Sequence, residues 1–224
     1  RPCRSETVAL FPRRDRSDVE RQVADLLATA RESLDMSVAF LSRLDGVTQH
    51  LEVVEASAPA SVLFREGATQ RQETTFCQAI LDGRLPAVIP DVRRFPAAMA
   101  LPAARMPRIR SYVSVPVTLS DGTLYGTFCA AGLTSDAELS ERDRALMEVL
   151  ARAAALIIEP GVVERSRRSE IEHRLAPLLE AGGPVVVAQP IVDLASGGRV
   201  GAEALSRFPA EWAMAPDTCF AEAH

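Results

Sequence analysis

The pattern that most constrains the fold is a β-hairpin in the middle of the chain. Residues 111–120 and 123–132 are rich in β-branched and aromatic residues, and the dipeptide Asp121-Gly122 separates them. Asp-Gly favours the two-residue turns that join antiparallel strands, so it fixes which residues face each other. The expected pairs are Ser120 with Thr123, Leu119 with Leu124, Val117 with Gly126, Val115 with Phe128 and Val113 with Ala130. We expect an antiparallel sheet with these apolar residues on one face, covered by helices.

Helices are expected before and after this hairpin. Ser17 can cap a helix whose apolar residues follow a 3.6-residue period: Val19, Val23, Leu26, Leu27, Ala30 and Leu34. Ser140 can cap a long helix through Glu159, with one apolar stripe: Leu146, Val149, Leu150, Ala153, Leu156 and Ile157. Pro160-Gly161 is expected to kink or break that helix, because proline cannot donate the helical hydrogen bond. A charged linker helix should follow.

Shorter signals fill the space between the first helix and the hairpin. Residues 36–44 and 47–56 predict two strands joined at Asp45-Gly46, and residues 59–72 predict a loop. A short helix is expected at 73–82, ended by Gly83, and a short strand at 87–89. The Pro- and Ala-rich segment 91–107 predicts helical turns mixed with loop.

This order of elements resembles a GAF sensory domain spanning residues 17–159, an α+β fold. Three stretches carry the likeness: Cys77-Gln78-Ala79-Ile80-Leu81-Asp82-Gly83, Val88-Ile89-Pro90-Asp91-Val92, and the hairpin pattern from Ser111-Tyr112-Val113-Ser114-Val115-Pro116 to Gly126-Thr127-Phe128-Cys129. The resemblance implies terminal helices on one face of the antiparallel sheet and a ligand pocket on the other. The pocket residues it implies are Phe76, Cys77, Tyr112, Ser114, Thr127 and Cys129. The alternative is that these side chains pack a closed domain.

Several ligands known for such domains fit this sequence poorly. The cyclic-nucleotide constellation needs Asn and Lys, and the chain has neither; bilin attachment uses a Cys next to a His, which is absent. For haem, His50 and His173 are poorly placed as axial ligands. Relatives that reduce free methionine sulfoxide need a cluster of cysteines, and residues 91–110 contain none, so this activity is the least expected. We expect an unidentified small molecule or no ligand, with no covalent pigment or haem.

Cys77 has two interpretations. It is either a small apolar residue on the inner face of a short helix, or a thiolate stabilised at a helix N-terminus. The four cysteines lack the spacing of a zinc site or a disulfide framework, which indicates reduced thiols. The net charge of −5 disfavours a nucleic-acid partner, and the Arg-rich residues 1–16 predict a solvated arm. Without an apolar run long enough for a membrane span, we expect a cytoplasmic location.

The C-terminal part contains a second pair of predicted strands. Gln189-Pro190-Ile191-Val192-Asp193 and Glu203-Ala204-Leu205-Ser206-Arg207 flank the turn Ala195-Ser196-Gly197-Gly198. Because strand side chains alternate, Glu203 and Arg207 should lie on one face. A carboxylate suits a hard divalent cation, and an arginine suits a neighbouring phosphate.

These residues resemble the beginning of an EAL-type cyclic di-GMP phosphodiesterase, a modified α/β barrel. The resemblance implies that Glu203 binds a catalytic Mg²⁺ or Mn²⁺ and that Arg207 and Gln189 contact the dinucleotide. Such a barrel needs roughly 250 residues, so we expect residues 182–224 to be only its truncated start, and the chain itself to be inactive. Residues 160–181 are then the linker helix between the two domains.

The sequence therefore predicts a bacterial signalling protein in which a GAF sensor governs cyclic di-GMP hydrolysis. The alternative is a cyclic di-GMP receptor or interaction module with a degenerate EAL domain. Because GAF domains often pair through their terminal helices, the resemblance also implies a homodimer.

Overall fold

A computed structural model describes residues 16–58, 60–105 and 109–222 of the chain, with only the backbone of Arg105. The predicted arm therefore lies outside the described residues, except for Arg16. This side chain is not a free surface group: it donates to the Val54 carbonyl at 2.9 Å and pairs with Glu55 and Glu66. The chain divides into two compact units, one ending at Pro160 and one beginning at Gly161, and each is described by itself.

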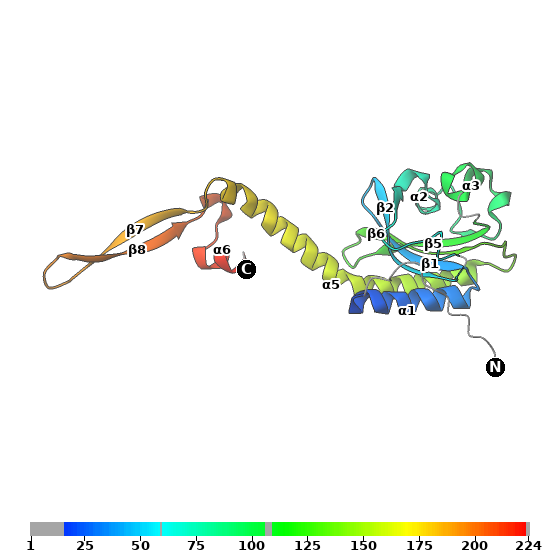
Figure 1. Cartoon of the computed structure of the whole chain (residues 1–224), viewed down its shortest axis with the longest axis horizontal. Helices are drawn as coiled ribbons and strands as arrows, with labels where there is room; N and C mark the ends of the chain where they lie inside the picture. The colour runs from blue at the N-terminus through cyan, green and yellow to red at the C-terminus, as the bar shows by residue number, and fades with distance from the viewer. Residues whose placement is uncertain (1–15, 59, 106–108, 223–224) are drawn as a thin grey trace, which may run out of the picture. The chain divides into compact units, whose positions relative to one another are not determined.

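The first unit is built on a six-stranded antiparallel sheet in the order β3-β2-β1-β6-β5-β4 (Figure 1). Its strands are β1 (Val38–Leu44), β2 (Thr48–Ala56), β3 (Thr69–Arg71), β4 (Val88–Ile89), β5 (Ser111–Thr118) and β6 (Leu124–Gly132). The strand β3 lies in a segment predicted to be a loop. It forms because residues 69–71 pair with residues 48–50 at the edge of the sheet, a contact that sequence period does not reveal.

The predicted hairpin register is confirmed over most of its length. Val113 pairs with Ala130, Val115 with Phe128 and Val117 with Gly126. Near the turn the prediction was wrong: Leu124 pairs with Thr118, and not with Leu119, because the register shifts at this point. Such an irregularity lets the hairpin close with additional twist. The irregularity leaves the assignment of the two sheet faces unchanged.

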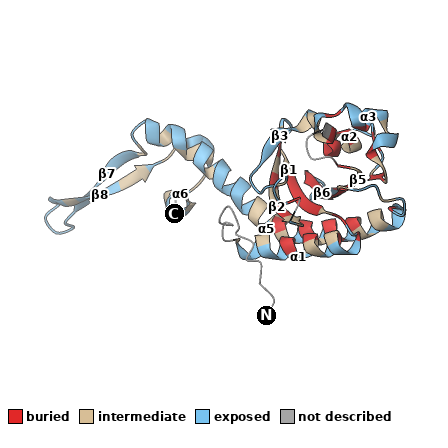
Figure 2. Ribbon diagram, turned by 45° about the vertical axis from the view of Figure 1, so that its right-hand side comes forward, coloured by how far each residue is buried: buried red, intermediate tan, exposed pale blue. Residues whose placement is uncertain are grey.

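Helices α1 (Asp18–Ser33) and the first half of α5 lie side by side on one face of the sheet (Figures 1 and 2). A capping box starts α1: the Ser17 hydroxyl accepts from the Glu20 amide, and the Glu20 carboxylate accepts from the Ser17 amide. The buried face of α5 differs from the predicted stripe, since it comprises Met147, Leu150, Ala151, Ala154, Ala155 and Ile158. Val149 and Leu156 are 63% and 71% exposed. Three alanines let the helix approach the sheet closely, while Met147, Leu150 and Ile158 fill the space beside them.

The helix α5 runs unbroken from Glu141 to Glu180, so Pro160-Gly161 does not break it, and a kink at this point stays a prediction. Proline removes one helical hydrogen bond, the one to the carbonyl of Leu156. Both Pro160 and Leu156 are exposed, so water can satisfy that carbonyl. The described part of the chain contains no helix with the length and apolarity that crossing a membrane requires.

Short elements cover the other face of the sheet (Figure 1). They are η1 (Gln72–Thr74), α2 (Phe76–Leu81), η2 (Val92–Arg94), α3 (Pro96–Ala100) and α4 (Pro102–Arg105). As predicted, Gly83 follows α2; its φ of +70° is one that glycine adopts without strain. A second hydrophobic core lies between these elements and the sheet, and it includes Phe40, Phe76, Tyr112 and Cys129.

The second unit contains the last part of α5, a two-stranded sheet and a short C-terminal region. The strands β7 (Val185–Val192) and β8 (Arg199–Arg207) pair antiparallel. After them come η3 (Ala210–Trp212) and α6 (Pro216–Glu222), where Phe208 stacks on Trp212 at 5.7 Å and Arg174 pairs with Glu222. The strand valines remain open to solvent: Val185, Val186 and Val187 are 67%, 63% and 39% exposed.

Candidate functional site

A cavity of about 390 Å³ lies between the sheet and the short helices, on the face that α1 and α5 do not cover. Its apolar wall consists of Phe40, Leu51, Leu63, Phe64, Ala68, Phe76, Pro102, Ala103, Ile109 and Tyr112. Its polar wall consists of Gln49, Thr69, Gln70, Thr74, Thr75 and Cys77. Among the described residues that line it, none carries a formal charge. The volume and the mixed wall suit a small, neutral and partly aromatic molecule.

The six predicted pocket residues divide into two groups of three. Phe76, Cys77 and Tyr112 line the cavity. Ser114, Thr127 and Cys129 are on the predicted face of the sheet, but they do not line the cavity, and that part of the prediction was wrong. They are fully buried, and the Cys129 sulfur lies against Cys77, Ser114 and Thr127, so these side chains fill the space behind Cys77.

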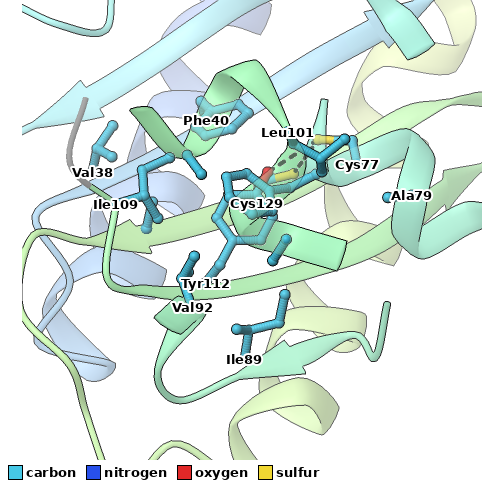
Figure 3. Packing of buried hydrophobic residues seen from close by; sticks show 14 of the residues in the cluster. Val38, Phe40, Cys77, Ala79, Ile89, Val92, Leu101, Ile109, Tyr112 and Cys129 are labelled. Carbon is cyan, nitrogen blue, oxygen red and sulfur yellow. Dashed lines mark hydrogen bonds between the residues drawn. The ribbon is translucent and has the colours of Figure 1, made fainter. Parts of the chain in front are cut away.

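The helix α2 positions the first group. Thr75 caps it, with its hydroxyl accepting from the Gln78 amide at 3.2 Å. Phe76 packs against Tyr112 with ring centroids 5.0 Å apart, and Cys77 follows on the inner face of the helix (Figure 3). The helical phase set by Thr75 therefore directs one aromatic ring and one thiol into the domain.

Polar side chains form a buried chain of hydrogen bonds from the cavity into the sheet. Gln70 donates to the Gln49 side-chain oxygen at 2.8 Å, and the Gln49 amide nitrogen donates to Ser42 at 2.8 Å. Ser42 and Thr127 lie 2.8 Å apart through their hydroxyls. Neither Gln49 nor Gln70 was predicted from the sequence. Alternation along β2 offered a signal, because Gln49 shares a face with the apolar Leu51 and is itself fully buried.

Two thiols are connected to this series of hydrogen bonds. The Cys77 sulfur lies 3.0 Å from the Tyr112 hydroxyl and 3.4 Å from the Cys129 sulfur (Figure 3). It also lies 3.0 Å from the Gln49 amide nitrogen. Cys129 also contacts the hydroxyls of Ser114 at 3.1 Å and Thr127 at 3.2 Å. Both cysteines are free thiols, and both are buried. The titratable groups that face Cys77 are therefore Cys129 and Tyr112.

The surroundings separate the acidities of these groups. Burial raises the pKa of Cys77, but hydrogen bonds from Cys129, Thr127, Tyr112 and Gln49 outweigh burial and lower the pKa to about 6. Burial raises the pKa of Cys129 well above its usual range, and its contact with Cys77 adds to this effect. Burial likewise raises the pKa of Tyr112. The arrangement favours one thiolate, on Cys77, with protonated partners around it.

Comparison with known proteins decides the family. The GAF domain family model matches residues 18–158, more than half of the chain. The chain belongs to the GAF domain family. No curated protein matches it. The cavity is thus in the place where the fold was expected to have its pocket.

Solved structures agree on the GAF fold. The GAF domain of an Acinetobacter phosphoenolpyruvate-protein phosphotransferase has a TM-score of 0.52 at 10% identity, covering 66% of this chain and 86% of that one. A far-red cyanobacteriochrome photoreceptor has a TM-score of 0.51 at 16% identity, covering 63% and 86%. The blue-light-absorbing form of the Thermosynechococcus elongatus PixJ GAF domain has 0.50 at 14%, covering 70% and 94%. At these identities the likeness concerns the fold alone.

The histidine considered for haem in the GAF domain lies away from the cavity. His50 bonds to Asp45 at 2.8 Å beside the β1–β2 turn, and it is not among the residues that line the cavity. The Asp45 carboxylate also accepts hydrogen bonds from the Thr48 and Val47 amides. The hydrogen bond from Thr48 makes the largest contribution to lowering the pKa of Asp45. His50 thus contributes to a turn.

The predicted dinucleotide-binding residues lie in the second unit. Gln189 on β7 pairs directly with Glu203 on β8. Arg207 is on the same face as Glu203, four residues along the strand. Glu203 and Arg207 are exposed. Among the described residues, no group of three His, Cys, Asp or Glu side chains is arranged to hold a metal ion.

Proposed function

We propose that this chain is the sensory GAF module of a bacterial signalling protein that hydrolyses cyclic di-GMP. One observation carries the enzymatic part of the proposal: Gln189 on β7 lies directly opposite Glu203 on β8. Gln189 begins the sequence QPIVD, and Glu203 begins the sequence EALSR. GAF domains belong to signalling proteins, and the cavity gives this one room for a small molecule. Sensing and hydrolysis would then be in separate units.

The face of β8 has the chemistry that the proposal needs. The Glu203 carboxylate would be one ligand of Mg²⁺ or Mn²⁺, which prefer carboxylate oxygens. The metal would neutralise phosphate charge and lower the pKa of a bound water. Arg207 would hold a phosphate of cyclic di-GMP through its planar fork, and Gln189 would supply an amide beside it. One carboxylate does not make a metal site, so the proposal requires further ligands besides Glu203.

The exposure of the second hairpin supports its place in a larger sheet. Valines on both faces of β7 and β8 are open to solvent, and an isolated two-stranded hairpin is marginally stable in water. In the proposed barrel, further strands and helices would cover Val185, Val186 and Val200.

Hydrolysis of cyclic di-GMP tests the proposal. The 224-residue chain should release no linear pGpG with Mg²⁺ or Mn²⁺, whereas the gene product extended past His224 should release it. In that extended protein, Glu203→Ala should reduce hydrolysis to background. Glu211→Ala, on the exposed η3 nearby, is the matched control and should retain activity. Equal activity of the two variants would contradict the assigned role of Glu203.

The alternative is a receptor or interaction module without hydrolysis. It predicts that the extended protein binds cyclic di-GMP, that Arg207→Ala weakens binding, and that no linear product forms. Titration calorimetry beside the hydrolysis assay separates the two functions. Reduction of free methionine sulfoxide stays the least supported function, because residues 91–110 contain no cysteine.

We also propose that the module is a cytoplasmic homodimer. On α5, Val149, Ala153 and Leu156 form one exposed or half-exposed apolar stripe beside α1, where Val19 is 42% exposed. A helix that is apolar on more than its buried face commonly has a second partner. A second copy of the same helices would cover this stripe.

A further inference from the structure

Two thiols that are far apart in the sequence meet at the floor of the cavity. Cys77 comes from α2 and Cys129 from β6, and their sulfurs are 3.4 Å apart (Figure 3). We propose that Cys77 and Cys129 form an oxidisable dithiol, which a small hydroperoxide entering through the cavity converts into a disulfide. This inference is independent of any role in cyclic di-GMP signalling.

Forming this disulfide requires little movement of the two sulfur atoms. A disulfide bond is about 2.05 Å long, so the sulfurs are within about 1.4 Å of bonding distance. Helix α2 has only six residues, and it can follow such a shift more easily than β6, which pairs on both sides with β1 and β5. The moving partner is therefore expected to be Cys77.

The cavity gives Cys77 a route to small molecules that its burial would otherwise prevent. Its side chain is only 1% exposed, yet it lines a cavity with room for small molecules of the size of a peroxide. Cys129 is 0% exposed and does not line the cavity. Cys77 is therefore the thiol that reacts with the peroxide. Cys129 is the thiol that then attacks the oxidised Cys77 sulfur to form the disulfide.

The surroundings also make Cys77 the better nucleophile. Thiolates attack peroxides, whereas neutral thiols react poorly. The Tyr112 hydroxyl and the Gln49 amide, both 3.0 Å from the Cys77 sulfur, stabilise negative charge there, which is consistent with its lowered pKa. The burial of Cys129 keeps that thiol protonated until Cys77 has reacted.

The reaction balances in two steps. The Cys77 thiolate attacks the terminal oxygen of the hydroperoxide and the O–O bond breaks. The leaving group, hydroxide from hydrogen peroxide or alkoxide from an organic hydroperoxide, takes the Cys129 proton and becomes water or an alcohol. Cys77 is then a sulfenic acid. The Cys129 thiolate attacks the Cys77 sulfur, and the departing hydroxide takes the proton that Cys77 had released. Two thiols are oxidised, and one peroxide is reduced.

Oxidation would change the cavity wall. Forming the bond draws the first turn of α2 towards β6, and Phe76 next to Cys77 moves with it. Phe76 packs on Tyr112, and both line the cavity. The dithiol would therefore couple oxidation to the shape of the pocket.

The test uses the 224-residue chain treated with hydrogen peroxide, then denatured, blocked with iodoacetamide, digested and mapped by mass spectrometry. We expect a peptide pair linked through Cys77 and Cys129 within one chain, reversed by dithiothreitol. Cys219, buried in the second unit, is the internal reference thiol. The proposal is overturned if Cys219 oxidises while Cys77 and Cys129 remain reduced, or if Cys77 passes to sulfinic acid without the link.

Variants assign the order of the steps. In a Cys3→Ser, Cys219→Ser background, Cys129→Ser should leave Cys77 as a sulfenic acid that dimedone traps. Cys77→Ser should slow oxidation of Cys129 by at least about ten-fold, because that thiol lacks a stabilised thiolate. A faster reaction at Cys129 than at Cys77 would contradict the assignment. If a variant does not fold, the peptide map of the unsubstituted chain still decides the question.

Discussion

At the residue scale, the most informative side chain is Cys77, for which the sequence left two interpretations. The structure contains elements of both: the thiol is buried in the core, and hydrogen bonds from four neighbours favour its ionised form. Sequence patterns placed Cys77 on the inner face of a helix. They could not show that Cys129, 52 positions later, and Tyr112 both touch its sulfur, because those contacts depend on tertiary packing.

The acidity of Cys77 gives a pH-dependent prediction. Because its pKa is lowered, the thiolate is present above the folded pKa and is lost as pH falls through about 6. The rate at which iodoacetamide alkylates Cys77 should therefore reach half of its plateau value near that pH. Unfolded protein should show the usual cysteine midpoint of about 8.5. Tyr112→Phe, which removes one hydrogen bond to the sulfur, should move the midpoint of the folded protein upwards; an unchanged midpoint would mean that Tyr112 does not stabilise the thiolate.

Ser17 tests the capping box at the start of α1. Ser17→Ala removes the acceptor for the Glu20 amide and should lower the free energy of unfolding by about 1 kcal/mol. Urea unfolding followed by circular dichroism measures this loss. Ser33→Ala, at the last residue of the same helix, is the control and should change stability much less. Equal losses would show that the cap contributes nothing specific.

At the element scale, the strands were more predictable than the helix faces. The register predicted from the Asp121-Gly122 turn holds for Val113, Val115 and Val117, but the shift at Thr118 beside the turn was not predicted. The face of α5 was predicted incorrectly because the helix carries apolar residues on two sides, and periodicity selects the larger ones. The contact with the sheet buries Ala151, Ala154 and Ala155 together with Met147, Leu150 and Ile158, so that Leu150 is the one residue of the predicted stripe that is buried. Strand β3 was missed because only its pairing with β2 identifies it.

The second apolar side of α5 predicts self-association. Leu156→Ser with Val149→Ser should shift the protein from dimer to monomer, because burying each side chain contributes roughly 1.5–3 kcal/mol. Light scattering over a range of concentrations measures the mass. Val47→Ser, at a 74% exposed residue beside the β1–β2 turn, is the control and should leave the mass unchanged. A monomeric unsubstituted chain at high concentration would contradict the proposed dimer.

The two hairpins should differ in local stability. Val115 and Phe128 on β5 and β6 are buried at 2% and 0% exposure, whereas Val186 and Val200 on β7 and β8 are 63% and 68% exposed. Amide hydrogen exchange of the 224-residue chain should be slow at the first pair and fast at the second. Equal protection would show that β7–β8 has found cover from another chain.

At the scale of the whole molecule, one chain contains a GAF domain with a cavity and a second unit that carries Gln189, Glu203 and Arg207. The family was predictable because the hairpin and flanking helices follow local rules. The family resemblance predicted the cavity wall only in part, since Phe76, Cys77 and Tyr112 line the cavity. The depth of Ser114, Thr127 and Cys129 follows only from how side chains of different size pack together.

Control of hydrolysis by the GAF domain is the central claim. The most direct measurement is the rate of cyclic di-GMP hydrolysis by the gene product extended past His224, with and without residues 1–160, the first compact unit. The account predicts hydrolysis by both proteins, with rates that differ several-fold because the sensor biases the enzyme. Equal rates would contradict regulation by the GAF domain, and the absence of hydrolysis in both proteins would contradict the phosphodiesterase itself.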